Sequence, residues 1–172
     1  MLIIRPESRS QHSAVRRIHE LAFGRPDEAR LVASLRESDT FLPKLSLVAQ
    51  QDKEPVGHVL LTPIRIMDGE LVQPALALAP LAVLPDYQNL GIGSQLMRYA
   101  LDRCQEYGYS TVIVLGSPRY YTRFGFEMAV PHRIFPPDPS WEEAFLVWCA
   151  DSRQLETLRG QVVYPPAFLE MS

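Results

Sequence analysis

The sequence has few cysteines and no excess of basic charge. Cys104 and Cys149 are its only cysteines, too few for a disulfide framework or a cysteine-based metal cluster. Lysine and arginine together number 17 against 20 for aspartate and glutamate, which gives a formal net charge of −3. A chain without a basic excess lacks the electrostatic signature of a nucleic-acid-binding protein. We therefore expect no nucleic-acid partner and no metal centre.

Long hydrophobic runs and a secretory leader are also missing. The longest apolar stretch, residues 75–84, contains Pro80 and is too short to cross a bilayer. The apolar run that begins at Met1 ends at once at Arg5, which does not fit the basic-then-apolar layout of a signal peptide. The sequence predicts a soluble, cytoplasmic protein without a membrane partner. Its length and 47% apolar content are typical of a single domain, expected to span residues 1–172.

Hydrophobic periodicity predicts alternating groups of helices and strands. Asp68-Gly69 is a hairpin turn between two of the strands, and four prolines between residues 131 and 139 indicate a loop. Because Pro80 cannot donate a backbone hydrogen bond, we expect an interruption or a bulge in the strand that contains it. The expected helices are 10–22, a short one from 26, 92–107 and 118–124; the expected strands are 2–5, 45–50, 56–67, 71–84, 111–115, one from 126, 145–149 and 161–164.

The pattern with the clearest chemical meaning is a strand that passes through a glycine-containing turn into the longest helix. Leu81–Leu84 supplies the strand, Gly91 and Gly93 lie in and just after the turn, and the helix follows. The first amides of a helix have no intrahelical acceptors and carry partial positive charge. Glycine lets such a backbone approach a phosphate closely. This arrangement predicts an anion site at the start of the helix.

Two common phosphate-binding motifs do not fit these residues. A dinucleotide fingerprint requires a third glycine where Leu96 stands, and the Gly-Lys-Ser/Thr of a P-loop is absent from the sequence. The remaining pattern, Gln88-x-x-Gly91-x-Gly93, resembles the Arg/Gln-x-x-Gly-x-Gly/Ala motif of the GCN5-related N-acetyltransferases, the GNAT family. Tyr121-x-x-x-Gly125-Phe126 resembles a second segment of that family. The tail from Gly160 is similar to a small bacterial branch whose acceptor is undefined.

The resemblance implies an α/β (α+β) fold, with a mixed, mostly antiparallel central sheet flanked by helices and a bulged strand before the CoA-binding helix. It implies acetyl-CoA as co-substrate, no metal, and direct transfer of the acetyl group to a primary amine. Tyr121 takes the position of the residue that protonates the departing thiolate. The residues implied in CoA binding are Leu81, Ala82 and Val83 for pantetheine, Gln88 for a side-chain or backbone contact, and Asn89, Leu90, Gly91, Ile92, Gly93 and Ser94 for pyrophosphate.

Several features of this function stay open. The strand before the glycine turn contains no acid or histidine, so no general base is assigned. His58 is the nearest titratable candidate, although a histidine satisfied within the sheet is the stronger interpretation. The acceptor amine and the use of longer acyl groups are not indicated, and a homodimer is compatible with the resemblance. A non-catalytic acyl-CoA-binding protein and a regulatory interaction protein on the same fold are the alternatives.

Overall fold

The computed structural model describes residues 1–170, which form two compact units. One unit comprises Met1–Thr62, Ala79–Arg103 and the C-terminal residues from Pro166, and the other comprises Pro63–Leu78 and Cys104–Pro165. The expectation of a single domain over residues 1–172 stays a prediction, and its last two residues lie outside the described part of the chain.

The first unit is built on three antiparallel strands. β1 (Leu2–Pro6) pairs with β2 (Ser46–Gln51), which pairs with the first half of β3 (Glu54–Asp68). Helix α1 (His12–Phe23) ends at Gly24, whose φ of 68° is left-handed, and α2 (Asp27–Arg36) follows. The unit also contains the end of β4 (Leu71–Val83), most of α3 (Ile92–Glu106) and the 3₁₀ turns Arg9–Gln11, Pro43–Leu45, Pro85–Tyr87 and Pro166–Glu170.

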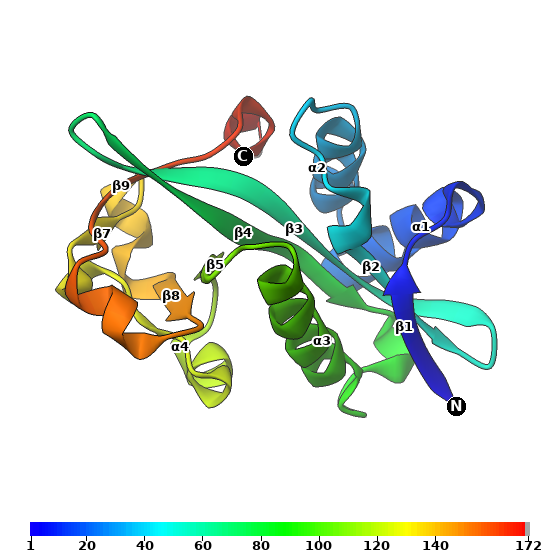
Figure 1. Cartoon of the computed structure of the whole chain (residues 1–172). Coiled ribbons are helices and arrows are strands. Elements are labelled where there is room, and N and C mark those ends of the chain that lie inside the picture. The colour runs from blue at the N-terminus through cyan, green and yellow to red at the C-terminus, as the bar shows by residue number, and fades with distance from the viewer. Residues whose placement is uncertain (171–172) are drawn as a thin grey trace. The chain divides into compact units, whose positions relative to one another are not determined.

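Neighbouring residues of β3 show which helix covers each face of this sheet. A Cβ at Gly57 would lie 2.9 Å from Leu96 Cδ1, so position 57 faces α3. Since side chains alternate along a strand, His58 points to the other face, where its ring contacts His19 of α1. The helices α1 and α2 thus cover one face and α3 the other (Figure 1). One core cluster beneath α1 and α2 consists of Val15, Leu31, Val32, Leu35, Val48 and Leu60.

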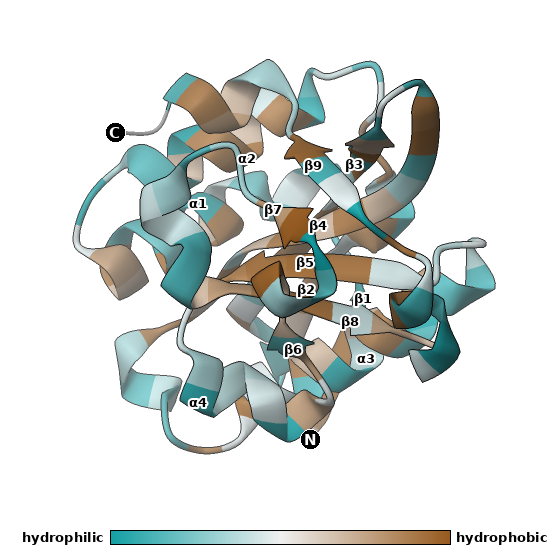
Figure 2. Ribbon diagram, turned by 90° about the vertical axis from the view of Figure 1, so that its left-hand side faces the viewer, coloured by the Kyte–Doolittle hydropathy of each residue, from teal (hydrophilic) through white to brown (hydrophobic). Residues whose placement is uncertain are grey.

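The second unit is built on strands from later in the chain. The first half of β4 pairs in parallel with β5 (Thr111–Leu115), which pairs antiparallel with β8 (Phe145–Cys149) and then β6 (Glu127–Met128). The short β9 (Gly160–Val163) pairs with the second half of β3 and with β7 (Ile134–Phe135). Most residues of β5 are buried, as its apolar sequence predicts, and the strand is brown in Figure 2. Helix α4 (Pro118–Tyr121) runs into the 3₁₀ turn Thr122–Phe124.

The mixed, mostly antiparallel sheet with flanking helices confirms the predicted fold class, but one local expectation needs correction. The proline-rich segment predicted as a loop contains β7 and the 3₁₀ turns Val130–His132 and Pro139–Ala144. β4 runs through Pro80 to Val83, with a cis peptide bond between Ala79 and Pro80, and the expected bulge at this proline stays a prediction. Within residues 1–170, none of the helices combines the length and the apolar character that crossing a bilayer requires.

A chain of polar side chains runs through the interior of the first unit. His19 Nε2 lies 2.8 Å from His58 Nδ1, and His58 Nε2 lies 2.9 Å from Ser46 Oγ. Ser46 donates to Glu7 Oε1 at 2.7 Å, and Arg36 binds the same carboxylate through Nε at 2.9 Å and Nη2 at 2.8 Å. Burial lowers the pKa of His19 to about 4 and the pKa of His58 well below its usual value.

These depressed pKa values predict a loss of stability in acid. The unfolded chain binds protons at the histidines near pH 6.5, whereas His19 in the folded chain binds one only near pH 4. The part of the folding stability that depends on the neutral histidines is therefore full above about pH 6.5. It is lost as pH falls toward 4, at about 1.4 kcal/mol per pH unit for each histidine. Chemical denaturation at a series of pH values should show a shallower decline for His19→Gln. His132→Gln, which removes a more exposed histidine, should match the wild type. Equal slopes for His19→Gln and wild type would contradict the assignment.

Candidate functional site

Two hydrogen bonds hold the strand-to-helix turn that is predicted as an anion site. After β4 ends at Val83, the N–H of Leu84 donates to the Val56 carbonyl at 2.8 Å. The side chain of Gln88 reaches back and donates through Nε2 to the carbonyl of Val83 at 2.9 Å. The side chain of Gln88, a residue predicted to contact CoA, therefore links the loop before α3 to the end of β4.

Two left-handed residues reverse the chain before α3. Asn89 has φ of 64° and Gly91 has φ of 84°, and asparagine and glycine are the residue types that adopt this conformation most readily. Helix α3 begins at Ile92, and the N–H of Gln95 donates to the carbonyl of Gly91 at 3.0 Å. The amides of Ile92, Gly93 and Ser94 precede that bond and have no acceptor within the helix.

The turn combines an exposed loop with an anchored helix. Gln88, Asn89, Leu90 and Gly91 are exposed, whereas Ile92 is buried and Gly93 and Ser94 are half-buried. Free amides and the positive end of the helix dipole thus lie beside an accessible backbone, which is the arrangement that binds phosphate groups. The residues predicted for CoA binding, Leu81–Val83 and Gln88–Ser94, all lie in the first unit.

A glycine that the motif did not reveal lets this helix lie close to the sheet. A Cβ at Gly57 would lie 2.9 Å from Leu96 Cδ1, 3.3 Å from the Ala82 carbonyl oxygen and 3.4 Å from Ile92 Cγ2. Any larger residue at position 57 pushes against both the end of β4 and the first turn of α3. In the sequence, the packing role of Gly57 is indicated only by its being a lone glycine inside a strand pattern, which is typical of a close approach by another segment.

Tyr121, the predicted general acid, lies in the second unit at the end of α4. Its half-buried ring makes edge contacts with Tyr120 and Phe126, at centroid distances of 5.0 and 5.7 Å. Burial raises the pKa of Tyr121 to about 12, with a smaller contribution from Tyr120. A Cβ at Gly116 would lie 2.5 Å from Tyr121 Cε2, so the ring packs directly on this glycine. That Tyr121 acts together with the amide turn stays a prediction.

His58 has the structural environment that the sequence favoured over a catalytic one. Both of its ring nitrogens have partners, His19 on one side and Ser46 on the other, and the residue has no exposed surface. It also points to the face of β3 opposite α3. Within residues 1–170, no group of three histidine, cysteine, aspartate or glutamate side chains is arranged to hold a metal ion.

Comparison with known proteins identifies close relatives. A family profile described as the acetyltransferase (GNAT) family matches residues 12–126. The uncharacterized N-acetyltransferase YjhQ of Escherichia coli K12 is 40% identical over 158 residues, covering 90% of this chain and 87% of YjhQ. The crystal structure of E. coli YhbS, a GNAT family N-acetyltransferase in complex with CoA, superposes with a TM-score of 0.90 at 35% identity, covering 99% of this chain and 93% of YhbS. A GNAT family acetyltransferase from Brucella melitensis in complex with acetyl-CoA gives a TM-score of 0.79 at 28% identity, covering 98% of both chains.

The contact between Gly116 and Tyr121 predicts a specific steric penalty. Gly116→Ala places a methyl group against the ring, and overpacking of this kind costs about 1–3 kcal/mol. Ser117→Ala, which changes the exposed neighbouring residue, should leave the free energy of unfolding nearly unchanged. Removing the ring with Tyr121→Ala should abolish the penalty of the alanine at position 116. Urea denaturation of the four chains of this double-mutant cycle measures the coupling, and a penalty of the same size with and without the ring would refute the contact.

Proposed function

The chain belongs to the GNAT family of acetyl-CoA-dependent N-acetyltransferases, and we propose that it passes the acetyl group directly to a primary amine while both substrates are bound. The observation that carries this proposal is the turn from Gln88 to Ser94, in which unpaired helix amides follow an exposed, glycine-containing loop. Such a turn suits the pyrophosphate of CoA. The relatives YhbS of E. coli and the Brucella melitensis enzyme, which bind CoA and acetyl-CoA, support the same assignment.

In this proposal the end of β4 binds the pantetheine arm through its backbone. Pantetheine contains amide groups that pair with the N–H and C=O groups of Leu81, Ala82 and Val83. The carbonyl of Val83 accepts a hydrogen bond from Gln88, and the N–H of the same residue is the donor that this proposal assigns to the thioester oxygen. A donor there stabilises the negative charge that develops on the thioester oxygen.

Direct transfer is supported by the state of the two cysteines. Cys104 is fully buried within α3, and burial raises the pKa of the half-buried Cys149 thiol. Because the thiolate is the nucleophilic form, neither residue is suited to carry an acetyl group. The neutral amine bonds to the thioester carbon, the carbon–sulfur bond breaks as CoA leaves as a thiolate, and the nitrogen releases its extra proton to solvent.

Tyr121 is proposed to donate a hydrogen bond from its O–H to the leaving sulfur. A pKa of about 12 keeps the phenol protonated throughout the neutral range. A thiol has a reference pKa of about 8.5, so complete transfer from this phenol is uphill. Tyr121 therefore acts mainly as a hydrogen-bond donor to the sulfur while charge develops on it, and solvent completes the protonation.

The left-handed conformation of Gly91 predicts a loss of acetyl-CoA affinity on substitution. No atom lies within 4 Å of a Cβ at this position, so backbone conformation rather than crowding is the constraint. Valine at position 91 moves the backbone out of the left-handed region, and acetyl-CoA binding must restore that conformation at a cost of about 1–2 kcal/mol. Calorimetry should therefore show a loss of about tenfold in acetyl-CoA affinity. Gly69→Val is a matched control, because Gly69 in the β3–β4 hairpin has φ of 59° and is equally uncrowded. An equal loss of affinity in both variants, or in neither, would contradict the assignment.

Replacing Tyr121 with phenylalanine separates its packing from its acidity. Tyr121→Phe keeps the ring on Gly116 but removes the O–H, so turnover should fall by roughly a hundred- to ten-thousandfold while acetyl-CoA affinity stays nearly unchanged. The deficit should shrink with an acyl donor whose thiol leaving group is more acidic. Steady-state kinetics and calorimetry on the same preparation provide both measurements.

Two outcomes would overturn this part of the proposal. Wild-type turnover in Tyr121→Phe, measured where chemistry is rate-limiting, would assign the tyrosine a packing role only. An acetylated protein trapped by mass spectrometry in the absence of amine, together with ping-pong kinetics, would replace direct transfer with a covalent intermediate.

A further inference from the structure

Gly57 lies where β3, β4 and α3 meet inside the first unit. It is buried, and the atoms nearest to a Cβ at this position are Leu96 Cδ1 at 2.9 Å, the Ala82 carbonyl oxygen at 3.3 Å and Ile92 Cγ2 at 3.4 Å. Leu96 and Ile92 belong to α3, and Ala82 lies near the end of β4. The missing side chain of Gly57 therefore lets α3 and the end of β4 contact β3 at the same point.

The requirement at position 57 is for space and not for a special backbone conformation. Gly57 is not among the glycines with positive φ, so an alanine could adopt its strand conformation without strain. Leu96 is fully buried among packed neighbours, and the Ala82 oxygen belongs to the backbone of β4. Because neither atom can move far without its element, a methyl group at position 57 changes the spacing between β4 and α3.

The two elements that meet at Gly57 supply the two halves of the proposed CoA site. Ala82 belongs to the strand end proposed for pantetheine, and Ile92 belongs to the helix start proposed for the pyrophosphate. The strand end is also fixed to β3, because the N–H of Leu84 donates to the Val56 carbonyl at 2.8 Å. Adjacent residues of β3 thus contact both halves.

CoA joins pantetheine and pyrophosphate covalently, so it binds both halves at once only if their spacing matches its own. Two linked contacts of this kind bind more tightly than either alone by roughly a hundred- to ten-thousandfold, and the advantage is lost when the geometry prevents both from forming. Given the CoA site proposed above, on which this role rests, we propose that Gly57 is a positioning residue for acetyl-CoA. Its missing side chain keeps the end of β4 and the start of α3 at the spacing that one CoA molecule spans.

Half-ligands separate this spacing from the integrity of either half. S-Acetylpantetheine carries the thioester and the pantetheine arm only, and ADP carries the pyrophosphate without that arm. In Gly57→Ala, acetyl-CoA affinity measured by calorimetry should fall about tenfold, which is part of the advantage that linkage provides. NMR titrations of the same chain should give nearly wild-type affinities for S-acetylpantetheine and for ADP, since each uses one half of the site.

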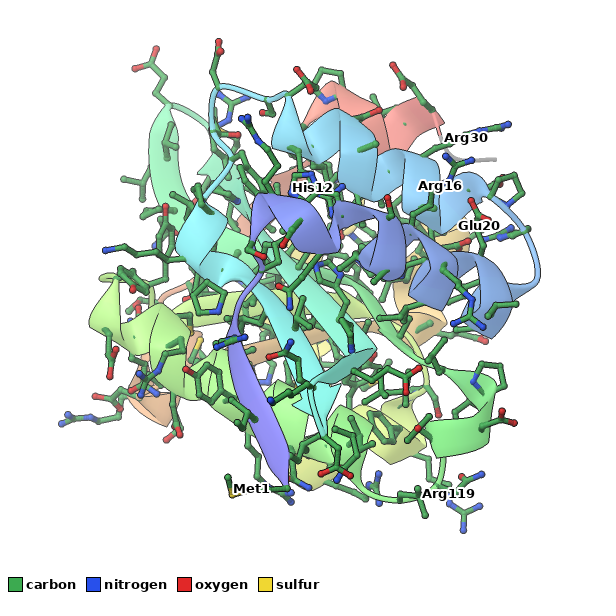
Figure 3. All side chains as sticks on the ribbon, turned by 90° about the vertical axis from the view of Figure 1, so that its right-hand side faces the viewer. Met1, His12, Arg16, Glu20, Arg30 and Arg119 are labelled. Atoms are coloured by element: carbon green, nitrogen blue, oxygen red, sulfur yellow. The ribbon has the colours of Figure 1, made fainter. Side chains whose placement is uncertain are left out.

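Val15→Ala is the control for a general loss of stability. Val15 is buried on α1, the helix that carries the labelled His12, Arg16 and Glu20 in Figure 3, and it packs on the face of the sheet opposite α3. Its truncation leaves a cavity and lowers the free energy of unfolding. Acetyl-CoA affinity should nevertheless stay at the wild-type value.

A second pair of variants covers the case in which Gly57→Ala alone does not fold. Leu96→Val removes the side-chain atom nearest to position 57, so Gly57→Ala/Leu96→Val keeps the new methyl group against the Ala82 carbonyl but relieves its closest contact. Relative to Leu96→Val, the double variant should show the same pattern in weaker form, with a smaller loss for acetyl-CoA and none for the half-ligands.

Wild-type acetyl-CoA affinity in Gly57→Ala would overturn the positioning role and leave the proposed function intact. An equal loss for acetyl-CoA and for one half-ligand, an equal loss in Val15→Ala, or the absence of a saturable shift with either half-ligand in the wild-type chain would overturn it as well. Failure of the wild-type chain to bind acetyl-CoA would instead contradict the proposed function itself.

Discussion

The packing of α3 on the sheet depends on one steric constraint, its close contact with β3 at Gly57. Only at this distance does the first turn of α3 pack beside the end of β4, since a Cβ at position 57 would meet both Leu96 and the Ala82 carbonyl. The anchored Ile92 holds the start of the helix, and the left-handed Asn89 and Gly91 turn the chain so that free amides meet an exposed loop. A strand carbonyl, a helix side chain and a glycine thus position the turn that we propose as the anion site.

The opposite face of the same strand depends on an electrostatic contact. Glu7 and Arg36 form a bidentate ion pair with 4% and 14% of their side-chain surfaces exposed. Removing one member of a buried pair of this kind costs about 3–5 kcal/mol, because the remaining charge has no partner. The pair also sets the hydrogen-bond direction through Ser46, His58 and His19.

The sequence predicted the fold and the amide turn well because their signals are local. Helix periodicity, strand alternation and the Gln88-x-x-Gly91-x-Gly93 motif are each contained within a short segment. Gly57, Gly116 and the partners of His19 were not assigned roles, since each acts through a contact with residues distant in sequence or with a ring whose position only the fold defines. The interpretation of His58 as a satisfied sheet residue is confirmed, although its partners Ser46 and His19 were not foreseen.

The central claim, that the chain transfers acetyl groups from acetyl-CoA to amines, is tested most directly by following free thiol release over a broad panel of amines. The panel should include small amines, amino acids, aminoglycosides and peptides with free N-termini or lysines. We expect amine-dependent thiol release together with a matching acetylated product by mass spectrometry. Acetyl-CoA binding without turnover on any amine would indicate a non-catalytic acyl-CoA-binding protein, and failure to bind any CoA ester would contradict the account altogether.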